Sequence, residues 1–170
     1  MLMATCRHSL REAPTVAFSA RTVPPTNNPI DGDQVYFNLP RVAMVRWDSP
    51  SQSAYIEWQG WATPAEFRAA NDALVQAIRN HHGSRVLGDS RRIKVIQKTD
   101  QEWVNQDWFP RILAAGLTRM AMVLPASGLA KMNIDDMVGR VADRLDVAYF
   151  PSLGEARVWL ARSSRDPRTA

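Results

Sequence analysis

The residues best suited to chemistry lie in a short charged stretch, where Asp89 is followed by Arg91 and Arg92, with Thr99 a few positions further on. A carboxylate beside arginines can orient a guanidinium toward a phosphate, a carboxylate ligand or an acidic partner. Thr99 opens a predicted helix, and the free N–H groups of a helix's first turn attract anions. We therefore expect these four residues to form a binding site. The plainer alternative is an ion pair, a cap and a solvated charged surface.

The tryptophans give a second signal. Trp58, Trp61, Trp103 and Trp108 flank the same charged stretch. Indole rings at this density can line an apolar pocket, and we expect Trp58, Trp103 and Trp108 to do so. The alternative is burial in the core, because a tryptophan removes a large area from water.

No complete catalytic set is visible. Ser90 follows Asp89, but a triad would need His81 or His82 to reach Ser90 through the fold. The single cysteine, Cys6, has no cysteine or histidine at zinc-ligand spacing. We therefore expect no catalytic residues, no metal ligands and no cofactor, and keep a Ser90 hydrolase as an alternative that a structure can test.

Composition narrows the class of protein further. The chain has 170 residues, 45% of them hydrophobic and 22% charged, which is typical of one globular domain. It contains no run of about 18 apolar residues, so we expect no transmembrane segment. The lone cysteine favours a reducing cytoplasm. The net charge of +4 is small, and no nucleic-acid-reading motif is present, so we expect no nucleic-acid partner.

Three Thr/Ser-x-x-Glu boxes indicate how these residues are positioned. They run from Thr63 to Glu66, from Thr99 to Glu102 and from Ser152 to Glu155, each after a strand-like segment. Such a box caps a helix through two reciprocal hydrogen bonds. The predicted strands are 41–48, 54–58, 85–88, 117–124 and 146–150, and the predicted helices begin at Pro64, Thr99, Asn133 and Ser152, with a kink or restart at Pro110.

The resulting order is ββαβαβαβα. Strands joined through helices require crossovers, so we predict an α/β fold with a mixed, mostly parallel sheet and an antiparallel N-terminal hairpin at its edge. Residues 1–38 are rich in proline and lack periodicity, and we expect a flexible tail there. A single domain is expected over 39–163, followed by a frayed end at 164–170.

The pattern over residues 41 to about 162 resembles a STAS domain, the family of anti-sigma-factor antagonists and stand-alone bacterial proteins. Two runs carry the resemblance: Arg85-Val-Leu-Gly-Asp-Ser-Arg-Arg-Ile-Lys-Val-Ile96, followed by a helix, and Arg119-Met-Ala-Met-Val-Leu124. Antagonists have Asp-Ser-Ser/Thr-Gly at the start of the second helix, where a kinase modifies the serine. This chain has Gln97-Lys98-Thr99-Asp100 there. The resemblance therefore implies an interaction or ligand-binding module in a bacterial cytoplasm.

Our leading hypothesis is a non-enzymatic STAS-like regulatory module. It would bind a protein partner through the loops at the carboxyl ends of the strands, where open α/β sheets collect their ligands. The rival is a small-molecule carrier in which tryptophans wall a pocket and an arginine holds an anionic or lipid-like ligand. The sequence leaves the oligomeric state open.

Overall fold

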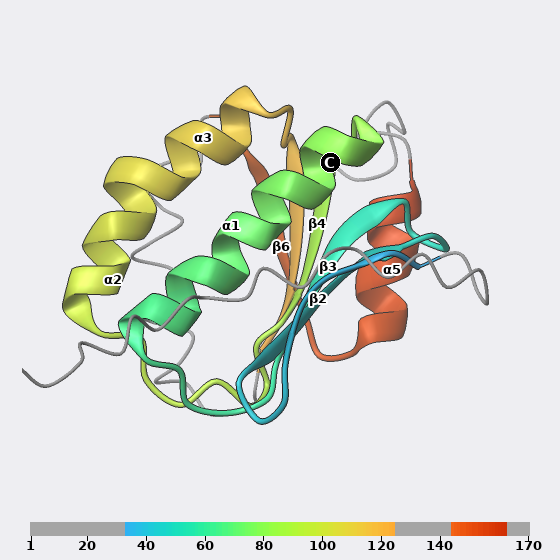
Figure 1. Ribbon diagram of the computed structural model, residues 1–170. Coiled ribbons are helices and arrows are strands. Elements are labelled where there is room, and N and C mark those ends of the chain that lie inside the picture. The colour runs from blue at the N-terminus through green and yellow to red at the C-terminus, as the bar shows by residue number, and fades with distance from the viewer. Residues whose placement is uncertain (1–32, 125–143, 163–170) are drawn as a thin grey trace, which may run out of the picture.

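A six-stranded sheet forms the centre of the computed structural model, which describes residues 33–124 and 144–162 (Figure 1). Its strands follow one another in chain order: β1 (Val35–Leu39), β2 (Ala43–Asp48), β3 (Ser53–Trp58), β4 (Arg85–Asp89), β5 (Arg119–Val123) and β6 (Asp146–Phe150). The pairs β1–β2 and β2–β3 are antiparallel, and the pairs from β3 to β6 are parallel. The predicted α/β class with a mixed sheet is confirmed.

The helices are divided unequally between the two faces of the sheet. They are α1 (Pro64–His81), α2 (Lys98–Trp103), the π-helical turn η1 (Val104–Trp108), α3 (Phe109–Ala114) and α5 (Leu153–Ala161). Figure 1 shows α1 and the continuous run from α2 to α3 on one face, and α5 alone on the other. Right-handed crossovers place α1 and the α2–α3 run on the same face, because each connects a strand to its next neighbour in one direction.

Two of the three predicted caps are present. Thr63 accepts a hydrogen bond from the Glu66 N–H, and the Glu66 carboxylate accepts one from the Thr63 N–H, so α1 starts with a complete capping box. Ser152 likewise accepts from the Glu155 N–H at the start of α5. Both caps are local devices that a sequence pattern specifies well.

The predicted cap at Thr99 is wrong. The cap position lies two residues earlier, at Gln97, which makes no side-chain hydrogen bond, and the helix begins at Lys98. A tertiary contact accounts for the shift: the buried Asp100 carboxylate accepts from Arg68 Nε of α1 at 3.0 Å. This ion pair ties the first turn of α2 to α1, and the Thr99 side chain is exposed.

The predicted restart at Pro110 is confirmed. Phe109 and Pro110 begin α3, and the turn before them is the π-helical η1, in which the Phe109 N–H donates to the Val104 carbonyl five residues earlier. Proline has no N–H to donate, so a change of helical pitch beside it disturbs fewer hydrogen bonds than an unbroken α-helix would.

The first strand was not expected. β1 starts at Val35, inside the segment 1–38 that the sequence predicts as tail, and pairs with β2 through contacts such as Phe37 with Val45. β1 therefore extends this edge of the sheet into a three-stranded antiparallel meander. The predicted hairpin is confirmed as β2 and β3. The helix predicted from Asn133 lies outside the described residues.

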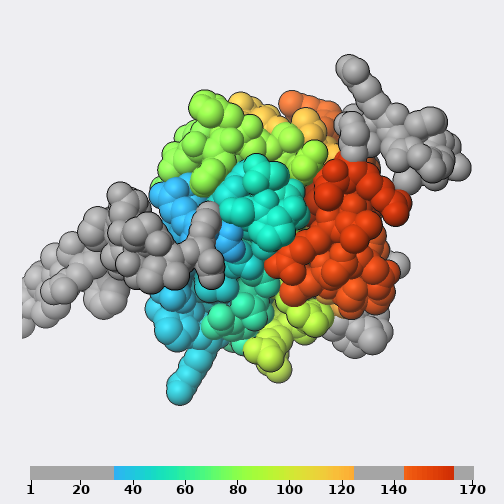
Figure 2. Space-filling model, turned by 90° about the vertical axis from the view of Figure 1, so that its right-hand side faces the viewer, coloured from blue at the N-terminus to red at the C-terminus, as the bar shows by residue number. Residues whose placement is uncertain are grey.

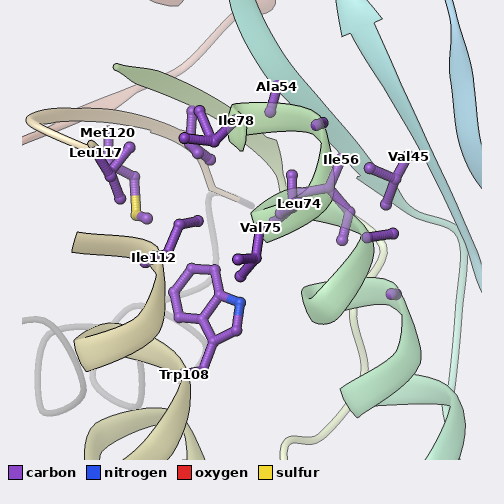
Figure 3. Packing of buried hydrophobic residues seen from close by; sticks show 14 of the residues in the cluster. Val45, Ala54, Ile56, Leu74, Val75, Ile78, Trp108, Ile112, Leu117 and Met120 are labelled. Atoms are coloured by element: carbon purple, nitrogen blue, oxygen red, sulfur yellow. The ribbon is translucent and has the colours of Figure 1, made fainter. Parts of the chain in front are cut away.

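The larger hydrophobic core lies between the sheet and α1, with the α2–α3 run closing it (Figure 3). Trp108 projects from η1 toward α1, and its indole N–H donates to the Asn71 carbonyl at 2.7 Å. A smaller cluster, which includes Tyr55, Leu87 and Leu160, packs α5 against the other face. Among the described helices, none is long and apolar enough to cross a membrane.

Candidate functional site

Four connections gather at the carboxyl edge of the parallel strands, which lies at the bottom of Figure 1. They are the β1–β2 turn and the segments that follow β3, β4 and β6. The β1–β2 turn is tied to the segment after β3: the Gln59 N–H donates to the Val42 carbonyl at 2.9 Å, and the Arg41 N–H donates to Gln59 Oε1 at 3.0 Å. The loops after β3 and β4 follow neighbouring strands, since Glu57 pairs with Asp89.

Asp89 ends β4 and is only 4% exposed. Its carboxylate accepts from Arg91 three times: from the backbone N–H at 3.2 Å, from Nε at 2.9 Å and from Nη2 at 2.6 Å. These hydrogen bonds and the charge of Asp89 raise the pKa of the Arg91 guanidinium. Asp89 is therefore an anchor for the loop after β4. The sequence left open whether Asp89 pairs with Arg91 or Arg92, and in the structure it pairs with Arg91.

The loop at residues 90–97 has no regular secondary structure and presents two different faces. Arg92, Lys94 and Val95 are exposed, whereas Ile93 and Ile96 turn inward and pack against the core. Gln101 Nε2 donates to the Ile96 carbonyl at 2.9 Å and holds the inward face near α2. The loop therefore joins the protein surface to the core.

Large apolar side chains are exposed at this edge. Trp61 is 54% exposed and Val95 is 65% exposed. The cations Arg41, Arg92, Lys94 and Lys98 lie in the same connections and are also exposed. We call this surface the carboxyl rim: Arg41, Trp61, Arg91, Arg92, Lys94, Val95, Lys98 and Thr99. Figure 2 shows the loops after β3 and β4 adjoining at the lower edge of the molecule.

The acidic groups near the carboxyl rim are largely occupied by internal contacts. Asp89 holds Arg91, Glu66 belongs to the capping box, and Asp100 is buried against Arg68. Within residues 33–124 and 144–162, by contrast, Arg92, Lys94 and Lys98 form no ion pair. The rim therefore presents an excess of positive charge to solvent.

A cavity of about 60 Å³ lies beneath this loop. Trp58 and Trp108 are buried in its wall, Trp58 stacked on Phe67 with ring centroids 5.1 Å apart. Trp103 is not in the lining: it is partly buried against the same core, with the guanidinium groups of Arg68 and Arg111 5.4 and 5.7 Å from its ring centroid. The structure thus brings together two of the three tryptophans predicted to line a pocket.

The histidines do not approach Ser90. His81 stacks on Trp47, with ring centroids 4.1 Å apart, and Trp47 pairs with Ala54 at the start of β3. His81 therefore lies at the amino edge of the parallel strands, and His82 caps α1 beside it. Ser90 follows β4 at the opposite edge. The triad that the sequence left open is not formed.

A second charged cluster lies at the amino edge, on the α5 face, and sequence reasoning missed it. Asp48 is 1% exposed and accepts from Arg157 Nη2 at 2.8 Å, from Arg46 Nη2 at 3.1 Å and from Ser51 Oγ at 2.5 Å. Burial alone would raise the pKa of Asp48, but these hydrogen bonds and charges outweigh it and lower the pKa. We call Asp48, Arg46, Ser51 and Arg157 the amino-edge latch.

The exposed apolar members of the rim also went unrecognised as surface residues. Trp61 was grouped with the pocket tryptophans, and Val95 reads as part of the apolar patch 93–96. Residues 93–96 read Ile-Lys-Val-Ile, and this short run does not indicate which of its three apolar side chains face the core.

Comparisons with known proteins give no relative for this chain: no family model matches, and neither curated proteins nor solved structures show a significant similarity. The function of the protein is therefore inferred from the residues of this chain alone.

Proposed function

We propose that the protein is a non-enzymatic STAS-like regulatory module that binds a protein partner through the carboxyl rim. The observation that carries the proposal is that exposed Trp61 and Val95 and the exposed cations Arg92, Lys94 and Lys98 all lie in the connections that follow β3 and β4, at one edge of the sheet. Exposed apolar groups rimmed by polar residues are characteristic of protein interaction sites. Tryptophan and arginine are also enriched among the residues that dominate binding energy.

The chemistry of the rim specifies the kind of partner. Unpaired lysines and arginines attract acidic groups and accelerate encounter with them. Trp61 and Val95 supply the apolar contact that electrostatics alone does not. We therefore propose a partner segment that carries carboxylates around an apolar side chain. Thr99, whose hydroxyl is not used as a cap, lies in this surface as a contact residue.

Asp89 has a supporting role in this proposal. Its carboxylate is buried and holds the Arg91 guanidinium through two hydrogen bonds. A guanidinium fixed in this way loses less conformational entropy when it meets a partner carboxylate. Asp89 thus positions the loop, and the exposed cations make the contact.

The geometry favours the carrier hypothesis less. Pockets for drug-sized ligands occupy roughly 300 Å³ or more, whereas this cavity measures about 60 Å³. Its lining includes no charged side chain among the described residues, so nothing there would hold an anionic head group. A fatty acid or a nucleotide does not suit the space.

The proposal is tested by quantitative affinity capture from a lysate of the source cells. The bait variants are wild type, Arg92→Glu with Lys94→Glu, and Trp61→Ala. The matched control is Arg79→Glu with Arg144→Glu, because both residues are exposed and lie near the amino edge, away from the rim. Each double variant changes the net charge by the same amount.

We expect an acidic protein that wild type and the control retain equally and that either rim variant retains about tenfold less, the equivalent of about 1.4 kcal/mol. Its retention should also fall as salt is raised, because exposed charges are screened. If the rim variants retain every specific protein that wild type retains, the carboxyl rim is not the docking surface.

A further inference from the structure

The cavity beneath the loop after β4 is not explained by docking at the surface. Its floor is formed by strand residues, including Ile56 and Val86, and its far wall by α1 and η1. At about 60 Å³ it exceeds the roughly 10–15 Å³ that one water requires. Well-packed cores leave few voids of this size. The cavity is therefore a separate feature that docking at the carboxyl rim does not explain.

An irregular helical turn forms part of the wall. Val104 and Trp108 bound η1 and both line the cavity. π-helical turns are uncommon and frequently occur at functional sites. The π-helical turn η1 therefore lies directly beside the cavity.

The loop at residues 90–97 forms a further side of the cavity. Ile93 and Ile96 line the cavity from this side and are only partly buried. Few hydrogen bonds hold this wall: the Ile93 N–H donates to the Ser90 carbonyl at 3.3 Å, and the Ile96 carbonyl accepts from Gln101. A segment with so few backbone hydrogen bonds opens at low free-energy cost compared with the sheet.

The polar groups of the lining restrict the chemistry of an occupant. The Asn71 side-chain Nδ2 donates to the Phe67 carbonyl at 2.9 Å, and the Asn71 backbone carbonyl accepts from the Trp108 indole N–H at 2.7 Å. Ser90 is the other polar residue that lines the cavity within residues 33–124 and 144–162, and the other lining residues there are apolar or aromatic. A charged or strongly polar ligand would lose its hydration without replacement hydrogen bonds.

We propose that this cavity binds a small uncharged apolar ligand, about the size of one aromatic ring, and that Ile93 and Ile96 move outward to admit it. An engineered apolar cavity of about 150 Å³ holds benzene, and the cavity here has less than half that volume. A ring therefore fits only when the loop yields.

Binding in the cavity would act on the carboxyl rim. Arg92, Lys94 and Val95 alternate with Ile93 and Ile96 along the same loop, so an outward movement of the isoleucines displaces the exposed residues. The ligand would thereby regulate docking of the partner. This last step rests on the proposed function; the binding of the ligand does not.

The test is an NMR titration of the full-length ¹⁵N-labelled protein with benzene. We expect saturable shifts at the cavity lining and throughout residues 91–97. Ile96→Ala should bind at least about fivefold more tightly because the wall residue that must move is shortened, and Ile96→Phe should lose binding because its own ring fills the space. Val95→Ala is the matched control, since Val95 is adjacent but exposed, and its affinity should equal that of wild type.

The absence of saturable shifts in both wild type and Ile96→Ala would overturn the proposal. So would shifts centred on the surface groove between β6 and α5, near Trp159, or equal affinities for Ile96→Ala and Ile96→Phe. Shifts of the lining without shifts of residues 91–97 would refute the movement of the loop. The titration contains no partner protein, so a failure of docking at the rim leaves its outcome unaffected.

Discussion

The two edges of the sheet use the same kinds of charged residue in opposite ways. At the amino edge, Asp48 is held by Arg157, which is 109 positions away in the chain, and by Arg46 from its own strand. At the carboxyl edge, Asp89 is held by Arg91, two positions away. The latch joins α5 to β2, whereas the Asp89 pair shapes only its own loop.

This difference separates a structural ion pair from a functional surface. In the latch, Arg157 and Arg46 both pair with one carboxylate that is removed from solvent, and Arg46 pairs with Asp33 as well. At the rim, Arg91 pairs with Asp89 while the neighbouring Arg92 and Lys94 face solvent. A charge that is exposed and unpaired costs little stability and remains available to a partner. The comparison therefore predicts large stability effects at one edge and mainly binding effects at the other.

Removing the carboxylate of the latch should have the largest effect. Asp48→Ala removes the buried carboxylate that Arg157 and Arg46 share; because both guanidinium groups are partly exposed and Arg46 keeps its ion pair with Asp33, we expect a loss of about 2–3 kcal/mol. Asp89→Ala is the counterpart at the rim, and we expect about 1 kcal/mol because Arg91 can turn to water. Urea denaturation measures both free energies of unfolding. Equal losses of unfolding free energy would show that the Asp89–Arg91 pair stabilises the fold as much as the latch does.

The latch should also make stability depend on acid. The pKa of Asp48 is lower in the folded protein than the unfolded value of about 3.9, so its contribution is complete above that pH and is lost as pH falls through the folded pKa. The gap in unfolding free energy between wild type and Asp48→Ala should therefore be constant near neutrality and narrow below about pH 4. Denaturation at a series of pH values checks this, and a gap that widens in acid would contradict it.

Adding a methylene group distinguishes the cavity from the packed core. Val45 and Val86 are both buried strand residues in the same core cluster, but Val86 lines the cavity. Val45→Ile should cost about 1–3 kcal/mol through overpacking. Val86→Ile should be neutral or stabilising by up to about 0.8 kcal/mol, the value of one buried methylene. Thermal denaturation compares them, and a loss at Val86 as large as at Val45 would argue against an open cavity.

The smallest stability effect belongs to the exposed cations. Arg92→Glu with Lys94→Glu should change the free energy of unfolding by no more than about 0.5 kcal/mol, because neither side chain is buried or paired. Chemical denaturation of this variant beside wild type provides the measurement. A loss of more than about 2 kcal/mol would show that Arg92 and Lys94 contribute to the stability of the fold.

Local features of the fold were predictable from sequence, and long-range ones were not. The caps at Thr63 and Ser152 and the restart at Pro110 depend on residues within one turn, so a pattern suffices. The predicted cap at Thr99 failed because Arg68, more than thirty residues earlier, pairs with Asp100. β1 was missed because its five residues make a short edge strand whose identity depends on pairing with β2.

The candidate site shows the same limit. The charged loop and its Asp89–Arg91 pair were predictable because the partners are adjacent. Whether a tryptophan lines the cavity depends on how the helices pack, which is why Trp58 and Trp108 lie in its wall and Trp103, also predicted there, does not. The latch joins residues so far apart that no spacing indicates it.

The central claim is that the protein meets its partner at the carboxyl rim, and photo-cross-linking tests it most directly. A photoreactive benzoylphenylalanine would replace Val95 in one variant and Val158 in another, because Val158 is 55% exposed but lies on α5. In the source cells, we expect position 95 to form a covalent adduct with an acidic protein, to lose it when Arg92→Glu and Lys94→Glu are added, and position 158 to form none. An adduct at position 158 alone, or one at position 95 that survives the charge reversal, would contradict the account.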